Sequence, residues 1–301
     1  MADFHPDLLR TAKRLPRTLV TARTLPIMRA VEHLTSRRVP PDVEELTLPS
    51  GAGVRLHRPP DGTGPGPAVL WIHGGGYVMG TPAQDDATCR RLARELGATV
   101  AAVRYRLAPE YPYPTSLEDC YAALTWLSGL PAVDRDRVAI GGASAGGGLA
   151  AALALLARDR GEVPVVAQLL VYPMLDDRSG DGVGADDAEF RLWTRSSNRF
   201  GWRCYLGDAD PTVAVPARRD DLGGLPPAWV GVGTLDLFHD EDLEYAERLR
   251  AAGVPCEVEV AEGAFHGFDA VVAKAPVSQR FVGSQLDFLR RSLTPGESAS
   301  R

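Results

Sequence analysis

Short apolar runs alternate with amphipathic stretches along most of the chain, and this alternation predicts its fold class. The apolar runs AVLWI, ATVAAV, RVAI and VVAQLLV are rich in valine, as buried strands of a parallel sheet are. Between these runs, residues 85–97, 116–129 and 145–161 have the spacing of apolar residues that is typical of helices. We expect the glycine that ends each of these helices to adopt the left-handed conformation. Strands alternating with helices indicate an α/β fold with a mostly parallel sheet covered on both faces.

Two segments break this alternation. Residues 1–40 have helical spacing but are cut by prolines, and residues 43–59 predict two antiparallel strands around Ser50 and Gly51. Residues 176–224 are rich in Asp, Arg, Gly and Pro and also carry aromatic side chains. The alternation then resumes, with strands expected at 228–234 and 256–263 and helices at 240–253 and 278–293.

The composition of the chain argues against several classes of function. The chain has 301 residues, which suits one large domain or a domain with a sub-domain, and its net charge of −6 supplies no attraction to nucleic acid. No apolar run of about eighteen residues predicts a transmembrane helix, and the first residues lack the apolar core of a secretory signal. We interpret the basic amino-terminal region as a solvated helical face rather than a membrane contact. The scattered cysteines indicate reduced thiols in a cytoplasmic protein, and the scattered histidines have no zinc-type spacing.

The segment GGASAGGG at residues 141–148 places a serine between a predicted strand and a predicted helix. The pattern Gly142-x-Ser144-x-Gly146 in this context is typical of a nucleophile elbow, a tight turn that lifts the serine hydroxyl out of the sheet. The flanking glycines let strand and helix pass closely, and the helix start places positive dipole beneath an oxyanion. On this motif alone, a glycine-rich turn without chemistry remains the alternative.

A serine hydroxyl needs a base, and two later strand ends offer an acid and a base in the order that such hydrolases use. Asp236 follows the strand expected at 228–234, and His266 follows the strand expected at 256–263. Both therefore lie at the sheet edge where sites form in open α/β folds. His239 is also close to Asp236 in sequence, but its place at a helix start favours a capping or surface role.

The segment HGGGY at residues 73–77 directly follows another predicted strand. Its glycines allow the backbone to approach a substrate, so that backbone N–H groups can meet the charge of a tetrahedral intermediate. We expect His73 to brace this loop by hydrogen bonding rather than to act as a base. A flexible turn without that function is the alternative.

Taken together, these motifs resemble the hormone-sensitive lipase family of α/β-hydrolases, the bacterial esterases with an HGGG loop. The matching segments occur in the family order and cover roughly residues 45–292: HGGGYVMG, YRLAPEYPYP, GASAGGG, LDLFHDE and FHGF. The resemblance implies the α/β-hydrolase fold, with an eight-stranded, mostly parallel sheet flanked by helices and a helical cap. Residues 1–45 and the insertion 176–224 would form the cap, and residues 46–175 and 225–301 the catalytic domain.

The resemblance also implies carboxylesterase activity without a cofactor or metal. Its catalytic roles correspond to Ser144, Asp236 and His266. Its oxyanion donors correspond to the backbone N–H groups of Gly75, Gly76 and Ala145, with His73 and Gly74 supporting the loop.

Four positions depart from the family pattern. Ala143 stands where the family often has Asp, Gly148 where it has Asn, Arg104 where an acid is common, and Leu237 where Pro is usual. The first two bear on the rigidity of the elbow, and the others on stability and substrate preference, but none touches the predicted triad. Glu110, within YRLAPE, is expected to pair with a nearby cation or backbone donor.

We therefore expect hydrolysis of small-molecule esters with short to medium acyl chains through an acyl-enzyme on Ser144. The charged insertion offers no wide apolar face for an oil surface, and its aromatic residues Trp193, Phe200 and Trp202 are expected to turn inward. No nucleic acid or stable membrane insertion is expected, and a homodimer is left open. The alternatives are an amidase or acyltransferase of the same fold, and a hydrolase-like receptor for a small ligand.

Overall fold

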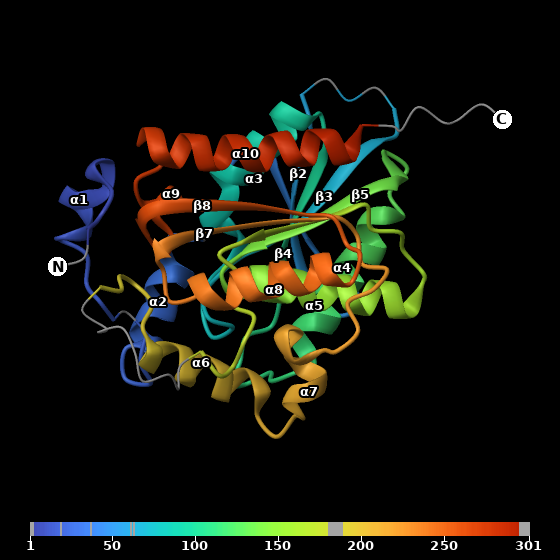
Figure 1. Ribbon diagram of the computed structural model, residues 1–301. Helices are drawn as coiled ribbons and strands as arrows, with labels where there is room; N and C mark the ends of the chain where they lie inside the picture. Colours follow the sequence, from blue (N-terminus) through green and yellow to red (C-terminus); the bar gives the residue numbers. More distant parts are fainter. Residues whose placement is uncertain are drawn as a thin grey trace.

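The computed structural model describes residues 3–18, 20–36, 38–60, 62, 64–179 and 189–294, and eight strands in this part of the chain form one sheet in the order β1-β2-β4-β3-β5-β6-β7-β8 (Figure 1). The pairs β1–β2 and β2–β4 are antiparallel, and every other neighbouring pair is parallel. The strands are β1 Val43–Thr47, β2 Gly53–His57, β3 Gly66–Ile72, β4 Thr99–Arg104, β5 Val133–Ala143, β6 Ala167–Val171, β7 Ala228–Leu235 and β8 Cys256–Phe265. The expected eight-stranded, mostly parallel sheet of the α/β class is confirmed.

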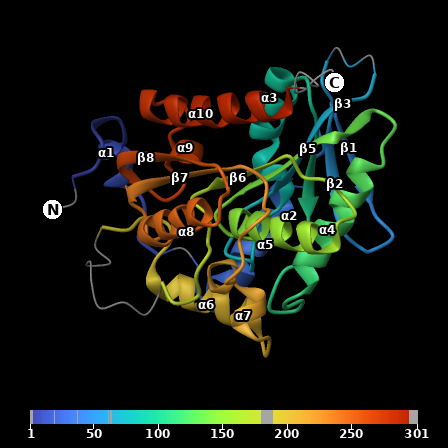
Figure 2. The ribbon, with the colours of Figure 1, turned by 45° about the vertical axis from the view of Figure 1, so that its right-hand side comes forward.

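Helices cover both faces of this sheet (Figures 1 and 2). One face carries α3 Asp86–Leu96 and α10 Pro276–Leu293, and the other carries α4 Thr115–Ser128, α5 Ala145–Arg160 and α8 His239–Ala251. The remaining helical segments are α1 Pro6–Ala12, α2 Leu25–Thr35, η1 Pro82–Asp85, α6 Arg195–Leu206, α7 Pro211–Ala214, η2 Pro216–Arg218 and α9 Phe268–Val271.

The alternation of side chains along the central strands divides the core into two layers. Leu70 and Ile72 of β3 belong to the apolar cluster under α4, α5 and α8, whereas Val69 and Trp71 belong to the cluster under α3 and α10. All four side chains are almost fully buried. Successive residues of a strand point to opposite faces, so a strand covered on both sides must be apolar at every position.

The parallel register brings the carboxyl ends of four strands to one edge. Ile72 of β3 pairs with Gly142 of β5, and Leu235 of β7 pairs with Phe265 of β8. The residues that follow these strands therefore emerge together at this edge. They are the residues on which the predicted chemistry depends.

Two of the three expected left-handed helix ends are present. Gly97 and Gly161 have φ of 60° and 64°, as expected for left-handed C-caps. The expectation is wrong at Gly129, which has φ of −88°. Its N–H continues the helical hydrogen bonding, to the carbonyls of Thr125 and Trp126, so α4 ends in a tight right-handed turn that needs no positive φ.

The amino-terminal segment and the insertion lie in contact, although they are far apart in sequence. The hydroxyl of Ser197, on α6, donates to the carbonyl of Val20 at 2.8 Å. The guanidinium of Arg191 donates to the carbonyl of Ala12 at 2.7 Å. In Figure 1, α2, α6 and α7 lie together on the side of the sheet opposite α10. Part of the insertion expected at 176–224, residues 180–188 with Asp181, Asp186 and Asp187, lies outside the described residues.

Where the chain is described, none of its helices combines the length and the apolar character needed to cross a membrane.

Candidate active site

The nucleophile elbow is formed between β5 and α5, where the sequence predicts it. Ser144 has φ of 58° and ψ of −123°, a strained conformation for a residue with a side chain. Its N–H donates to the carbonyl of Val171, and its carbonyl accepts from the N–H of Met174. These bonds to the segment that follows β6 hold the strained turn in place, so that the hydroxyl projects from the end of the sheet.

The glycines on either side of Ser144 allow the tight passage of backbone that the elbow requires. A Cβ at Gly146 would collide with the carbonyl of Ile72, and a Cβ at Gly142 would collide with the carbonyls of Gly146 and Ile72. Strand β5, helix α5 and the end of β3 therefore approach one another more closely than any other residue would permit. The glycine spacing of the motif has a packing cause.

The structure brings Ser144, His266 and Asp236 into one hydrogen-bonded chain. His266 Nε2 lies 2.9 Å from Ser144 Oγ, and His266 Nδ1 lies 2.8 Å from Asp236 Oδ2. An aspartate oxygen can only accept, so Nδ1 carries the proton and the neutral ring accepts the serine proton at Nε2. All three residues are buried, at 7%, 8% and 4% exposure.

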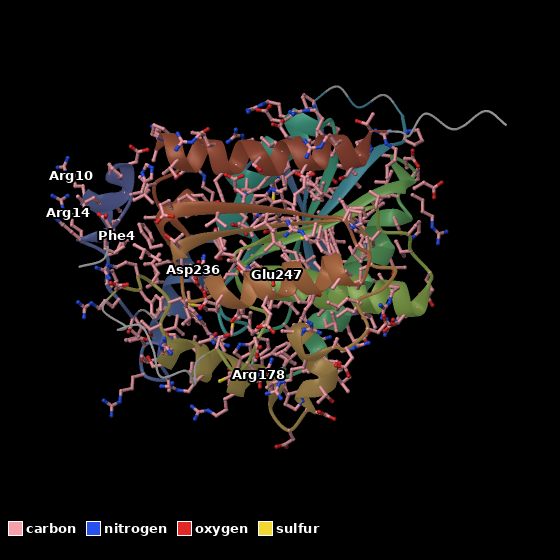
Figure 3. The ribbon with its side chains drawn as sticks, in the orientation of Figure 1. Phe4, Arg10, Arg14, Arg178, Asp236 and Glu247 are labelled. Atoms are coloured by element: carbon pink, nitrogen blue, oxygen red, sulfur yellow. The ribbon has the colours of Figure 1, made fainter. Side chains whose placement is uncertain are left out.

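Asp236 is held from both sides. Its second oxygen accepts the N–H of Phe238 at 3.0 Å, in the turn between β7 and α8 where Figure 3 labels it. The side chain itself is inaccessible to solvent. With one oxygen bound to the backbone and the other to imidazole, the carboxylate fixes the orientation of the His266 ring.

His239 lies elsewhere, as predicted. It is the first residue of α8, is partly exposed, and its Nδ1 lies 2.8 Å from Oδ1 of the neighbouring Asp240. Its ring bonds to Asp240 and not to Ser144, so its closeness to Asp236 in sequence does not place it in the chain of hydrogen bonds.

The HGGG loop passes directly over the serine. A Cβ at Gly74 would lie 3.2 Å from the Cβ of Ser144 and 2.9 Å from the carbonyl oxygen of Ala143. Gly75 and Gly76 have φ of 125° and 60°, which favour glycine. Among the described residues, no turn or cap hydrogen bond uses the N–H groups of Gly75, Gly76 or Ala145. The loop therefore passes close to Ser144, and its own turns do not use these N–H groups.

His73 braces this loop. Its Nδ1 lies 2.8 Å from the carbonyl oxygen of Gly74, and its ring stacks on Tyr105 with centroids 4.3 Å apart. The hydroxyl of Tyr105 donates to the carbonyl of His73 at 3.0 Å. Burial lowers the pKa of His73 to about 4, so the imidazole is neutral at neutral pH and donates from Nδ1.

The lowered pKa of His73 predicts a loss of stability in acid. In the unfolded chain this histidine takes up its proton at a pKa of about 6.5, but in the folded chain only near 4. Between these values the unfolded state binds more protons, so the free energy of unfolding should fall as pH falls, by up to about 3 kcal/mol from this group. Urea denaturation of wild type and His73→Gln across this range measures it. The variant should lose less stability on acidification, whereas His239→Gln should follow wild type. Equal slopes for wild type and His73→Gln would contradict the prediction.

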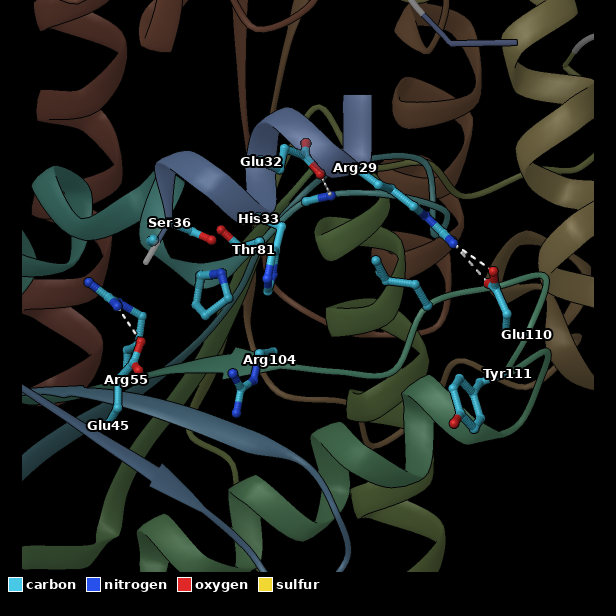
Figure 4. A pocket seen from close by; sticks show the side chains of 14 residues that line it. Arg29, Glu32, His33, Ser36, Glu45, Arg55, Thr81, Arg104, Glu110 and Tyr111 are labelled. Carbon is cyan, nitrogen blue, oxygen red and sulfur yellow. Dashed lines mark hydrogen bonds and ion pairs between the residues drawn. The ribbon is translucent and has the colours of Figure 1, made fainter. Parts of the chain in front are cut away.

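Helix α2 is hydrogen-bonded to the segment that follows the HGGG loop (Figure 4). The carboxylate of Glu32 accepts the N–H of Gly80 at 3.0 Å. The guanidinium of Arg29 donates to the carbonyls of Val78 and Ala108 and to the carboxylate of Glu110. The expected pairing of Glu110 with a cation is present, and through Arg29 α2 is joined both to the segment after the HGGG loop and to the YRLAPE loop.

Aromatic side chains of the insertion turn inward. Trp193 and Trp202 are 5% and 2% exposed, whereas Phe200 is only partly buried. The indole of Trp193 occupies the space where a side chain on Gly76 would stand, so it lies against the HGGG loop. Trp202 lies 5.1 Å from the ring of Tyr77, the last residue of HGGGY. These two tryptophans of the insertion therefore pack on the HGGG loop.

The structure gives a local cause for one departure from the family pattern, Gly148, and shows the surroundings of two others, Leu237 and Arg104. At Gly148, a side chain would collide with the carbonyl of Met174 and meet the hydroxyl of Tyr77 at 2.5 Å. That hydroxyl instead donates to the Met174 carbonyl at 3.0 Å, which ties the HGGG loop to the segment that follows β6. Leu237 is buried in the core below the cap, and the exposed Arg104 lies across the backbone of Gly53.

Two residues that support the site were missed by the sequence analysis. Glu241 is buried in the first turn of α8, and its carboxylate accepts the N–H groups of Leu175 and Asp176, where the chain leaves the sheet. Tyr172 places its ring edge-on against His266, with centroids 4.9 Å apart. Glu241 stands among three acidic residues that suit a helix start, and nothing in that run indicates that Glu241 and Asp242 turn inward while Asp240 is exposed.

The described residues contain no cluster of three or more His, Cys, Asp or Glu side chains that could hold a metal ion.

A model of the alpha/beta hydrolase fold family matches residues 69–270, more than half of the chain. The chain therefore belongs to this family, in the branch related to hormone-sensitive lipase that its HGGG loop and elbow indicated.

Known proteins resemble the chain over nearly its whole length. Esterase LipI of Mycobacterium tuberculosis is 35% identical over 303 residues, which cover 95% of this chain and 94% of LipI. Carboxylesterase NlhH of the same organism is 33% identical over 311 residues and 97% of each chain. The structure of a bacterial heroin esterase matches with a TM-score of 0.87 and 39% identity, over 97% of this chain and 98% of that one.

Proposed function

We propose that the protein is a carboxylesterase in which Ser144 is the nucleophile, His266 the general base and Asp236 the residue that orients it. The observation that carries this proposal is the buried hydrogen-bonded chain from Ser144 Oγ through His266 to Asp236, with lengths of 2.9 and 2.8 Å, on a strained elbow beneath an HGGG loop. The names of the relatives, an esterase and a carboxylesterase, agree with it.

The reaction follows from these positions. Ser144 Oγ attacks the ester carbonyl carbon while its proton passes to His266 Nε2. The carbonyl oxygen becomes an oxyanion and receives hydrogen bonds from the N–H groups of Gly75, Gly76 and Ala145, each contributing roughly 3–4 kcal/mol of transition-state stabilisation in comparable sites. His266 then protonates the leaving alcohol, and the acyl group remains on Ser144. Water, deprotonated by His266, attacks the acyl-enzyme and releases the carboxylic acid.

Asp236 contributes by holding the ring tautomer and stabilising the imidazolium that forms. Its carboxylate lies 2.8 Å from Nδ1 and is shielded from solvent, so its charge acts on the ring through little intervening water. The second oxygen remains on the Phe238 N–H throughout. Asp236 therefore need not move or take up a proton during the cycle.

The proposed substrates are soluble esters with short to medium acyl chains. Near the insertion's amino-terminal end, the guanidinium of Arg178 binds the carboxylate of Asp176, and that of Arg218 binds Asp177. The charged side chains in this part of the insertion form ion pairs, so it offers no wide apolar surface for adsorption to oil. Trp193 and Trp202 pack against the oxyanion loop instead, and side chains packed in this way set a finite depth for an acyl chain.

Activity should therefore peak at an intermediate acyl length. Until the acyl chain meets the wall, each added methylene should gain about 0.8 kcal/mol of burial, and beyond that overpacking should cost about 1–3 kcal/mol. We expect kcat/KM for p-nitrophenyl esters, from acetate to palmitate, to be highest at a few to about eight carbons and then to fall steeply. A maximum at the longest chains, or a jump in rate when substrate exceeds its solubility, would show that the cap behaves as a lipase lid.

An amidase or acyltransferase would use the same residues, so product analysis separates these activities from ester hydrolysis. The esterase proposal predicts free acid as the main product in the presence of added alcohol, and ester turnover far above that of the matching amide. Dominant transfer to the alcohol would favour an acyltransferase, and faster amide turnover would favour an amidase. Ligand binding without ester turnover would favour a receptor.

A further inference from the structure

A cavity of about 230 Å³ lies behind the elbow, between the sheet, α3, α9 and α10. Ala143, the residue before Ser144, forms part of its wall. Tyr172 forms another part, and the same ring lies edge-on against His266. The cavity therefore adjoins the catalytic residues from the face of the sheet that carries α3 and α10. Ala143 is the position at which the related esterases often carry Asp.

Two carboxyl groups face this cavity. Asp85 lies in η1 and accepts the indole N–H of Trp71 at 2.9 Å. Asp269 lies in α9 and accepts the hydroxyl of Tyr172 at 2.8 Å. Burial raises the pKa of both carboxyls, that of Asp85 to about 7, and their mutual repulsion adds to this shift for Asp85. Two acids that repel each other in an enclosed space favour a cation between them.

Three other charged or titratable groups among the described residues act on these acids: His266, Asp86 and Arg91. The charge of His266 lowers the pKa of Asp269. Asp86, the neighbour of Asp85, adds a negative charge but is bound by the guanidinium of Arg55. Arg91 of α3 also lines the cavity, and its guanidinium lies 3.4 Å from Oε1 of Gln279. Two facing carboxyls against one guanidinium leave the cavity negative when both acids are ionised.

An independent feature points to a ligand with an acceptor atom. Gln285 of α10 lines the cavity and is only 4% exposed, yet its side-chain NH₂ group has no hydrogen-bond partner among the described residues. A buried amide donor without a partner carries a cost of about 1–3 kcal/mol, which an acceptor in the cavity would remove. Apolar walls, among them Leu92, Val282 and Leu286, surround these polar groups.

We propose that this cavity is a binding site for a small organic ammonium ion that carries an apolar body and an oxygen acceptor, an amino ether or amino alcohol. The ammonium group binds between Asp85 and Asp269, the oxygen accepts from Gln285, and the apolar body packs against Trp71, Tyr172 and the aliphatic side chains. Aromatic rings beside the carboxylates favour an organic cation over a hydrated metal ion. Two carboxylates without a further acidic, His or Cys ligand also form a poor metal site.

The test is calorimetric titration of the full chain with 2-phenoxyethylamine, after Ser144 has been blocked covalently by a sulfonyl fluoride. We expect saturable binding that persists in the blocked protein, and no binding of the neutral isostere 2-phenoxyethanol. Affinity should rise roughly tenfold from pH 6 to pH 8, because Asp85 loses its proton near pH 7 while the amine stays protonated.

Variants locate the site. Asp85→Asn keeps an acceptor for Trp71 and should weaken binding about tenfold to a hundredfold, and Gln285→Leu should weaken it as well. Asp287→Asn, on the exposed side of α10 where it pairs with Arg290, is the matched control and should bind as wild type does. If Asp85→Asn does not fold, Gln285→Leu and the pH dependence of wild type carry the test.

Four results would each overturn the proposal. Absence of saturable binding would show that the cavity holds only water. Equal binding of 2-phenoxyethanol would show that charge has no part in it. Loss of binding when Ser144 is blocked would place the amine in the ester site. Unchanged affinity in both folded cavity variants would place it elsewhere on the molecule. The blocking step rests on the proposed reactivity of Ser144. The binding of the amine to unblocked protein, its dependence on charge and the effects of the variants do not depend on whether the protein hydrolyses esters.

Discussion

Replacing Ser144 by alanine is expected to lower kcat for ester hydrolysis by roughly 10⁴–10⁶-fold while the protein remains folded. The substitution removes only the hydroxyl group, whose hydrogen-bond partner is His266 Nε2. Without it no acyl-enzyme can form at the elbow, whereas the N–H groups of the HGGG loop and the cap contacts remain. The measurement is turnover of a short-chain p-nitrophenyl ester by highly purified protein.

A matched serine separates loss of chemistry from loss of structure. Ser292 of α10 is a partly buried serine, and its hydroxyl donates to the carbonyl of Phe288. Ser292→Ala should keep wild-type activity, and both variants should have the circular dichroism spectrum of wild type. Activity of Ser144→Ala within about tenfold of wild type would remove Ser144 from the role of nucleophile.

Replacing His266 by alanine is expected to cost as much as replacing Ser144, because the residues of such a triad act as a unit. His266 is the only histidine within hydrogen-bond distance of both Ser144 and Asp236 in the described part of the chain. Its loss leaves no base for the serine proton and no acid for the leaving alcohol. The kcat of each purified variant with the same ester measures the effect.

His239→Ala is the control for this prediction. His239 is nearer to Asp236 in sequence than His266 is, but it lies on α8 and bonds to Asp240. The variant should keep most of the wild-type activity. If His239→Ala lost activity and His266→Ala retained it, the assignment of the base would be reversed.

The elbow and the HGGG loop are predictable because their constraints are local. Close approach of the backbone requires glycine at positions 142 and 146, and Ser144 needs a turn between a strand and a helix. A short stretch of sequence is enough to indicate all three. The approach of Asp236 and His266 to Ser144 is also predictable, although they lie far apart in sequence. Parallel strands end at one edge, so residues that follow them must meet there.

Other features depend on contacts that no local pattern encodes. The pairing of Arg29 with Glu110 and the position of Trp193 over Gly76 arise from segments far apart in sequence. The sequence indicated that Glu110 would form a pair and that Trp193 would turn inward. It did not indicate which residue Glu110 pairs with or which segment Trp193 contacts. Glu241 lies among acidic residues at the start of a helix, and only the packing of that helix decides which of them are buried. The sequence analysis therefore did not predict its burial. The φ of Gly129 likewise depends on how the chain leaves α4, which the glycine alone does not determine.

The central claim, a covalent acyl-enzyme on Ser144, is tested most directly by mass spectrometry of protein quenched in acid during turnover of p-nitrophenyl butyrate. The account predicts one butyryl group per chain, found after proteolysis on the peptide that contains Ser144, and no such adduct in Ser144→Ala. Turnover without any covalent adduct, or an adduct on another serine or on a cysteine that persists in Ser144→Ala, would contradict it.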